Sequence, residues 1–231
     1  MKKLMAALIA VGMIAGTASA QEVLSRNAVG YVKQEINRGE QALLSVNFLS
    51  LEDVDGEYTA STLFGDQVPP GSTVYLWNPD GQAYVAENRF VEPIGWQPNT
   101  NRFRLGDSFF LSIDGAAPEE SYEVFIMGEV PDATTAPSVT RSIVEGLTAV
   151  SYPYPAEITV EDSELNDILP SGATLYYWDI DTQSYSAINK FVAPIGWQPA
   201  GYVLRPGVGL FIEMDADVLD GWEELIPYTW P

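Results

Sequence analysis

The sequence predicts an all-β protein made of two tandem antiparallel β units, each a β-sandwich or a small β-barrel, related by a pseudo-two-fold internal repeat. Residues 90–98 recur 101 positions later as residues 191–199, with eight of nine identical. The match extends without a gap over residues 68–113 and 169–214, where 21 of 46 positions are identical. Short apolar segments with two-residue alternation recur between turn-forming residues, which is typical of antiparallel sandwiches and barrels.

The expected strands follow from these apolar segments and from the turns between them, such as Asn78-Pro79-Asp80-Gly81. In the first unit they are residues 28–36, 41–48, 72–77, 83–91, 108–113 and 122–129. In the second unit they are residues 142–151, 174–178, 184–192, 209–214 and 222–228. One short helical turn is expected in each unit, at residues 59–64 and 162–168. Asp162 and Ser163 are suitable N-cap residues for the second.

The first 20 residues have the composition of a secretory signal peptide. Lys2 and Lys3 precede an apolar run, and Ala18-Ser19-Ala20 forms a small-residue cleavage site. The run is shorter than the about 20 residues that a membrane-spanning helix needs, and no later segment is a candidate span. We therefore expect cleavage after Ala20 and a secreted protein, located outside the cell, on its surface or in the periplasm.

The mature chain divides around a segment rich in proline and threonine. Residues 132–137 are expected to form an extended linker. The predicted organisation is a signal peptide at 1–20, a first β repeat at 21–131, the linker, and a second β repeat at 138–231.

Identities between the two copies fall on every second residue around one predicted hairpin. Because alternate residues of a strand share a face, these identities mark one preserved sheet face. Its members, matched 101 positions apart, are Thr73, Tyr75, Trp77, Gln82, Tyr84, Ala86 and Phe90 in the first copy and Thr174, Tyr176, Trp178, Gln183, Tyr185, Ala187 and Phe191 in the second. The main interpretation is that this face forms the core of each unit. The alternative is a glycan-binding face, because aromatic rings beside amides bind sugars.

The recurring Pro-Ile-Gly-Trp-Gln-Pro segment is preserved at consecutive positions, which indicates a fixed loop geometry. Its tryptophans, Trp96 and Trp197, are expected to plug the end of a small barrel, or alternatively to act as ligand platforms. The candidate glycan-binding residues are therefore Trp96, Trp197, Trp77, Trp178, Tyr84 and Tyr185.

Composition narrows the chemistry further. The net charge is −21, with 11 basic and 32 acidic residues, so nucleic acid is a poor partner. The chain has no histidine and no cysteine, which removes the usual catalytic triads and leaves metal sites to carboxylates alone. No acid in the matched block is shared by both copies except Asp80 and its counterpart Asp181. We therefore expect no enzyme activity, no cofactor and no metal site. A glycoside hydrolase that uses only acidic residues is the third alternative.

Several motifs resemble a group of uncharacterised secreted two-repeat β-domain proteins common in Verrucomicrobia and related bacteria. The resemblance covers nearly the whole mature chain, and the matching segments are Asn27–Val32, Leu43–Ser45, Gly71–Trp77, Gly106–Leu111 and Gly128–Val130. The chain departs from the group's Gly-x-Gly pattern at Gly106-Asp107-Ser108, whereas Gly207-Val208-Gly209 keeps it. The resemblance implies a secreted pair of β units and carries no activity.

The leading functional prediction is a non-enzymatic secreted or cell-envelope protein, structural or adhesive, built from two duplicated β units. Its expected partners are further copies of itself or a cell-surface polysaccharide. The alternative is a carbohydrate-binding protein that uses the preserved aromatic face.

Overall fold

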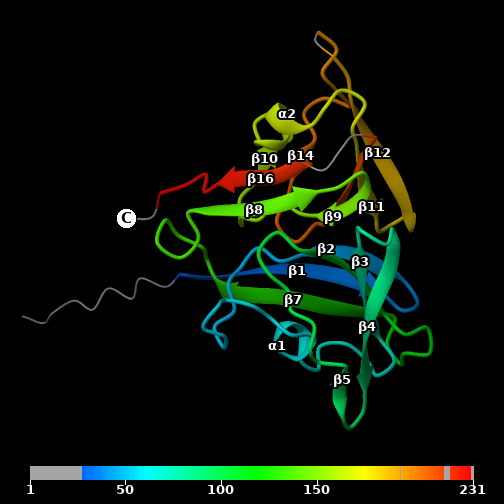
Figure 1. Cartoon of the computed structure of the whole chain (residues 1–231). Coiled ribbons are helices and arrows are strands. Elements are labelled where there is room, and N and C mark those ends of the chain that lie inside the picture. The colour runs from blue at the N-terminus through cyan, green and yellow to red at the C-terminus, as the bar shows by residue number, and fades with distance from the viewer. Residues whose placement is uncertain (1–27, 193, 216–218, 230–231) are drawn as a thin grey trace, which may run out of the picture.

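The computed structural model describes residues 28–192, 194–215 and 219–229 of the 231-residue chain (Figure 1). This described part of the protein is mostly β, with 45% strand, two short helices and several antiparallel sheets. This confirms the all-β class. The predicted signal peptide lies outside the described residues. We call residues 28–131 the first half and residues 138–229 the second half, and Figure 1 shows the second half above the first.

The first half contains a five-stranded antiparallel sheet with the strand order β2-β6-β3-β4-β5. Strand β3 occupies its centre and pairs with β6 on one side and β4 on the other. The strands are β2 (Gln41–Ser45), β3 (Thr73–Asn78), β4 (Ala83–Val91), β5 (Gly95–Gln97) and β6 (Ser108–Ser112).

The second half contains another five-stranded antiparallel sheet, with the order β13-β12-β11-β15-β9. Strand β11 is central and pairs with β12 and β15. The strands are β9 (Gly146–Val150), β11 (Thr174–Asp179), β12 (Ser184–Lys190), β13 (Trp197–Gln198) and β15 (Leu210–Met214).

Three two-stranded sheets complete the β structure, and two of them cover the five-stranded sheets. Strands β1 (Val29–Asn37) and β7 (Ser121–Glu129) pair in the first half. Strands β8 (Ser138–Ile143) and β16 (Leu219–Leu225) pair in the second half. The third pair is β10 (Ile158–Thr159) with β14 (Val203–Leu204).

Both helices lie where the sequence predicts a helical turn. Helix α1 (Ala60–Phe64) begins after Thr59, whose hydroxyl accepts a hydrogen bond from the Thr62 backbone N–H. Because the Thr62 hydroxyl in turn accepts a hydrogen bond from the Thr59 backbone N–H, the two residues form a reciprocal cap. Helix α2 (Leu165–Ile168) is shorter than expected, and Asp162 and Ser163 lie in the turn before it.

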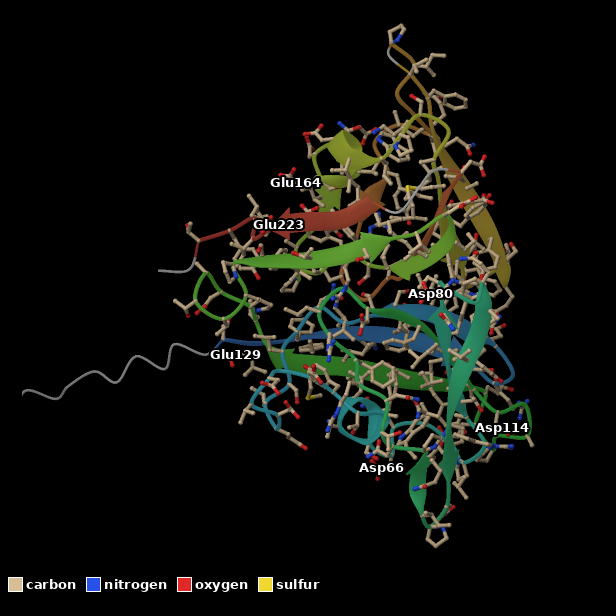
Figure 2. All side chains as sticks on the ribbon, viewed as in Figure 1. Asp66, Asp80, Asp114, Glu129, Glu164 and Glu223 are labelled. Carbon is tan, nitrogen blue, oxygen red and sulfur yellow. The ribbon has the colours of Figure 1, made fainter. Side chains whose placement is uncertain are left out.

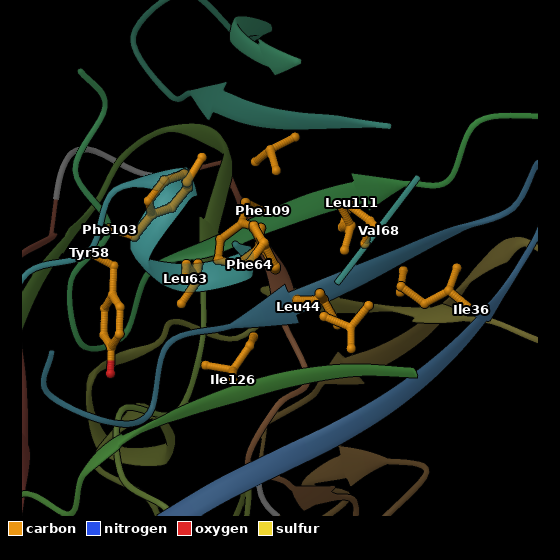
Figure 3. Close-up of a cluster of buried hydrophobic side chains, with 14 of the residues drawn as sticks. Ile36, Leu44, Tyr58, Leu63, Phe64, Val68, Phe103, Phe109, Leu111 and Ile126 are labelled. Carbon is orange, nitrogen blue, oxygen red and sulfur yellow. The ribbon is translucent and has the colours of Figure 1, made fainter. Parts of the chain in front are cut away.

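Each half has its own hydrophobic core between its five-stranded sheet and its two-stranded ribbon. In the first half, Leu44 and Leu111 from the sheet meet Ile36 and Ile126 from β1 and β7 (Figure 3). In the second half, Leu175 and Ile212 from the sheet belong to one cluster with Ile143 of β8 and Trp222 of β16. Each half therefore has two layers. The division of the chain at 132–137 remains a prediction.

Two details of the predicted fold are corrected. The sheets of the described residues are open, so the barrel alternative is wrong. The single strand expected at 142–151 is two strands, β8 and β9, in different sheets. The break lies at residues 144–145, directly before Gly146, whose φ of 82° is favoured by glycine and turns the chain between the two layers.

Candidate functional site

The preserved aromatic face lies between the two five-stranded sheets. Tyr75 and Trp77 of β3 and Tyr176 and Trp178 of β11 pack against one cluster shared by both halves. The buried members of this cluster are Leu43, Phe110 and Phe211. We call this contact between the sheets the joint. The finding corrects the expectation that the preserved face is the core of each unit.

The preserved face can cover the joint because side chains of neighbouring strand residues point to opposite faces of the sheet. Leu44 and Phe109 face the first core, whereas their neighbours Leu43 and Phe110 face the joint. Both faces of the sheet are thus buried, and strand periodicity shows which residues share a face but not what covers it. Phe90 does pack against the first core as expected, while its counterpart Phe191 is exposed.

Two sets of hydrogen bonds cross the joint in a reciprocal arrangement. The Trp77 indole N–H donates to the Leu147 carbonyl over 2.8 Å, and the Trp178 indole N–H donates to the Gln41 carbonyl over 2.9 Å. Each acceptor residue is also held by a glutamine side chain that donates to its carbonyl and accepts from its backbone N–H. Gln82 does this at Leu147, and Gln183 does it at Gln41.

These two glutamines have strained backbones. Gln82 and Gln183 have φ angles of 46° and 50°, and they are the non-glycine residues with positive φ in the described part of the chain. Such a conformation costs roughly 1–2 kcal/mol for an L-residue. It persists here because each side-chain amide makes three or more hydrogen bonds, at least two of them across the joint.

Tyr84 and Tyr185 meet at the solvent-exposed side of the joint. Their hydroxyl oxygens are 3.0 Å apart, and the side chains are 46% and 45% exposed. Each ring packs edge-on against a tryptophan of its own half. The ring centroids are 5.0 Å apart for Tyr84 and Trp77 and 4.9 Å apart for Tyr185 and Trp178. Burial of the inner parts of the rings raises the pKa of both phenols.

An apolar pocket of about 300 Å³ opens beside this tyrosine pair. We call it the aromatic pocket, and it is lined by Trp77, Tyr84, Leu147, Tyr176, Tyr185, Phe211 and Glu213. The Tyr176 hydroxyl donates to a Glu213 carboxylate oxygen over 2.6 Å, and this hydrogen bond raises the pKa of the phenol. The pocket thus offers ring faces and edges with one carboxylate and phenol oxygens at its border. Such a surface can bind apolar groups or the C–H face of a sugar.

The six predicted glycan-binding residues separate into three places. Trp77, Tyr84 and Tyr185 line the aromatic pocket. Trp178 lies in the joint, where its ring centroid is 5.1 Å from that of Phe110. Trp96 and Trp197 are each 1% exposed and lie in the two cores, so their indoles do not face a surface that a glycan could reach.

Sequence reasoning did not include four pocket residues among the candidates. Tyr176 and Phe211 did carry a signal, because each is identical to the residue 101 positions earlier. Leu147 and Glu213 carried none. Leu147 lies before the matched block, and Glu213 replaces a serine of the first copy.

Acidic groups are spread over the molecule. Figure 2 labels six of them, at positions that range from the α1 end of the molecule to the α2 end. Within the described residues, no group of three or more acidic side chains is placed to hold a metal ion. In the same part of the chain, no helix has the length and apolar character needed to cross a bilayer.

Comparisons with known proteins found no match. No family model, curated protein or solved structure matched this chain.

Proposed function

We propose that the protein is a non-enzymatic secreted or cell-envelope protein with a structural or adhesive role, built from two duplicated β units that pack as one body. The observation that carries this proposal is the use made of the preserved residues. Trp77, Gln82 and Tyr84 each contact the opposite half, and so do Trp178, Gln183 and Tyr185. The residues common to both copies therefore maintain the architecture.

The reciprocal contacts fit an approximate two-fold axis near the Tyr84 and Tyr185 hydroxyls. In a two-fold arrangement, a contact from residue i to residue j is accompanied by one from j to i. Gln82 of the first half binds Leu147, and Gln183 of the second half binds Gln41. By contrast, several core-facing strand residues have diverged, for example Leu76 and its counterpart Tyr177, although Trp96 and Trp197 are identical. We infer that the joint has been under a stricter constraint than either core.

Polar contacts also connect the two halves outside the aromatic cluster of the joint. The buried Asn47 side chain donates to the Tyr152 carbonyl over 2.6 Å and accepts from the Gly207 N–H over 2.7 Å. Arg141 forms an ion pair with Asp107 at 3.2 Å. A tightly joined pair of units is a suitable rigid element for a surface layer or an adhesive stalk.

Cosedimentation with the producing cell's isolated envelopes tests this role. The mature protein, residues 21–231, is mixed with envelopes at 0.15 M NaCl, pelleted and washed. We expect retention in the pellet, loss of retention in Trp77→Ala/Trp178→Ala, and retention in the exposed control Asp80→Asn. Free protein in the supernatant, or turnover of envelope polysaccharide, would argue against a structural role.

Carbohydrate binding is the second candidate, favoured by the aromatic pocket. Its ring surfaces and the Glu213 carboxylate suit a neutral sugar whose hydroxyl donates to the acid. Calorimetric titration with neutral oligosaccharides tests it. Sugar binding that Glu213→Gln weakens and Asp80→Asn leaves unchanged would support this candidate. No heat of binding at millimolar sugar would exclude it for the sugars used.

A further inference from the structure

The two preserved Pro-Ile-Gly-Trp segments form hairpin ends that project from the molecule. Residues 91–95 connect β4 to β5, and residues 192 and 194–196 follow β12 in the second half. Figure 1 shows these hairpins at opposite ends of the protein. We call residues 91–95 the first tip and residues 192 and 194–196 the second tip.

Both tips expose an isoleucine that is preserved between the copies. Ile94 is 69% exposed and Ile195 is 56% exposed. The hairpins themselves are anchored by Trp96 and Trp197, whose buried indoles donate to the Gly65 carbonyl and the Asn166 side chain. Exposed loop positions usually vary, and an exposed isoleucine adds nothing to these anchors. The two copies thus present the same exposed apolar side chain at corresponding positions.

We propose that the tip isoleucine inserts into the aromatic pocket of a second copy of this chain. The pocket volume of about 300 Å³ is ample for an isoleucine side chain, and the lining is apolar apart from Glu213 and the phenol oxygens. The two exposed tyrosines, Tyr84 and Tyr185, stand at its border. This inference rests on the proposed structural role and gives it a mechanism of assembly.

A second copy is the favoured occupant because one chain carries both complementary surfaces. The tips lie at the ends of the molecule, whereas the pocket lies at the joint between the halves. A contact between two different surfaces of identical molecules is heterologous and does not close on itself unless its rotation forms a ring. Tip-to-pocket contacts therefore produce open chains or networks, as a structural protein requires.

Charge distinguishes the two tips. The first tip carries Glu92, whose counterpart in the sequence is Ala193, and the pocket carries Glu213. Bringing Glu92 toward Glu213 is unfavourable, so the second tip is expected to bind more tightly. The net charge of −21 adds a general repulsion between copies, and salt screens it over a Debye length of about 10 Å at 0.1 M.

The expected association is weak and strengthens with salt. A single hairpin tip in a pocket buries less surface than the roughly 1,200–2,000 Å² of a stable interface. Sedimentation velocity of residues 21–231 from 10 µM to 1 mM, at 0.05 and 1 M NaCl, measures it. We expect the weight-average sedimentation coefficient to rise with concentration, and to rise more at 1 M NaCl. A protein that stays monomeric at 1 mM in 1 M NaCl overturns the inference.

Tip variants test the contact directly. Ile195→Asp should weaken association at least tenfold, and Ile94→Asp should weaken it less. The control is Leu51→Asp, because Leu51 is 59% exposed and belongs to neither the tips nor the pocket. Equal association in Ile195→Asp and wild type, or an equal loss in Leu51→Asp, overturns the inference. Far-ultraviolet circular dichroism of each variant establishes that it is folded.

Engineered thiols identify the pocket as the receptor. The natural chain has no cysteine, so only introduced thiols react. Ile195→Cys protein is mixed with a differently sized Leu147→Cys protein and treated with a short bis-maleimide. Leu147 is suitable because its backbone, not its side chain, makes the hydrogen bonds of the joint. We expect mixed dimers in excess of the statistical 2:1:1 ratio, and a statistical ratio overturns the inference. Envelope retention without self-association would leave the proposed function standing and remove only this mechanism.

Discussion

The hydroxyl groups of Tyr84 and Tyr185, from residues 101 apart in the chain, lie 3.0 Å from each other at the joint between the two halves. We predict that Tyr84→Phe lowers the free energy of unfolding by about 0.5–1.5 kcal/mol, the usual net value of one hydrogen bond. Because both variants remove the same hydrogen bond, Tyr84→Phe/Tyr185→Phe should cost less than the sum of the single changes. Urea unfolding of all four proteins measures the coupling, and strictly additive effects would show that the hydroxyls do not interact.

Gly209 of the second half lies in close contact with the first half. Its N–H donates to the Leu43 carbonyl, and a Cβ atom there would lie 2.1 Å from Ser108 Oγ and 2.8 Å from the Leu44 carbonyl oxygen. We predict that Gly209→Ala lowers the free energy of unfolding by about 1–3 kcal/mol through overpacking. Gly115→Ala is the control, because the nearest atom to its Cβ is 3.9 Å away. Equal stability of the two variants in urea would disprove the close approach.

The buried tryptophans should matter more to stability than those of the joint. Trp96→Ala and Trp197→Ala should each cost about 3–5 kcal/mol, the range for a fully buried large aromatic. Trp77→Ala should cost less, because Trp77 is only partly buried and Gln82 still donates to the Leu147 carbonyl after the indole is lost. Guanidinium unfolding compares the three. A larger loss at Trp77 than at Trp96 would reverse this ranking.

Glu224 is a buried acid that should make stability depend on pH. Burial raises its pKa to about 7, against the hydrogen bonds that it accepts from the Trp222 indole and the Glu164 backbone N–H. The folded protein therefore binds this proton more tightly than the unfolded chain. The resulting stabilisation is complete below about pH 4.5 and is lost as the pH rises to about 7, with a total on the order of 3 kcal/mol.

Glu224→Gln isolates this effect because an amide oxygen can accept the same hydrogen bonds without a charge. The stability of the variant relative to the wild type should rise between about pH 4.5 and pH 7 and then stay constant. Thermal unfolding at five pH values measures the difference, with the exposed neighbour change Glu223→Gln as the control. A difference that does not change with pH would show that Glu224 titrates normally.

Local sequence signals predicted most strands of this protein. Strand β4 has the bounds that the alternation and the flanking turns indicate, and β1, β2, β3, β6, β7, β11 and β15 differ from prediction at their ends. The β5, β10, β13 and β14 strands, of two or three residues, were missed because such lengths carry no periodicity. Gly146 was not identified as a break because the residues around it continue the apolar pattern.

The site was harder to predict than the strands. Alternation grouped Tyr75, Trp77 and Tyr84 on one face, but the covering layer is contributed by residues that are distant in the chain. The exposure of Ile94 and the burial of Trp96, two residues apart in one preserved segment, could not be separated without the hairpin geometry. Glu213 joins the aromatic pocket only through the register of β15 beside β11, which no local pattern specifies.

Cleavage of the linker tests most directly whether the joint holds the two halves as one body. A protease site is inserted among the exposed residues 133–135, and the cleaved protein is analysed by size-exclusion chromatography at micromolar concentration. We predict that the two fragments elute together at the position of the intact protein and separate only in denaturant. In cleaved Trp77→Ala/Trp178→Ala, the fragments should separate under native conditions. Separation of the wild-type fragments in native buffer would contradict the account.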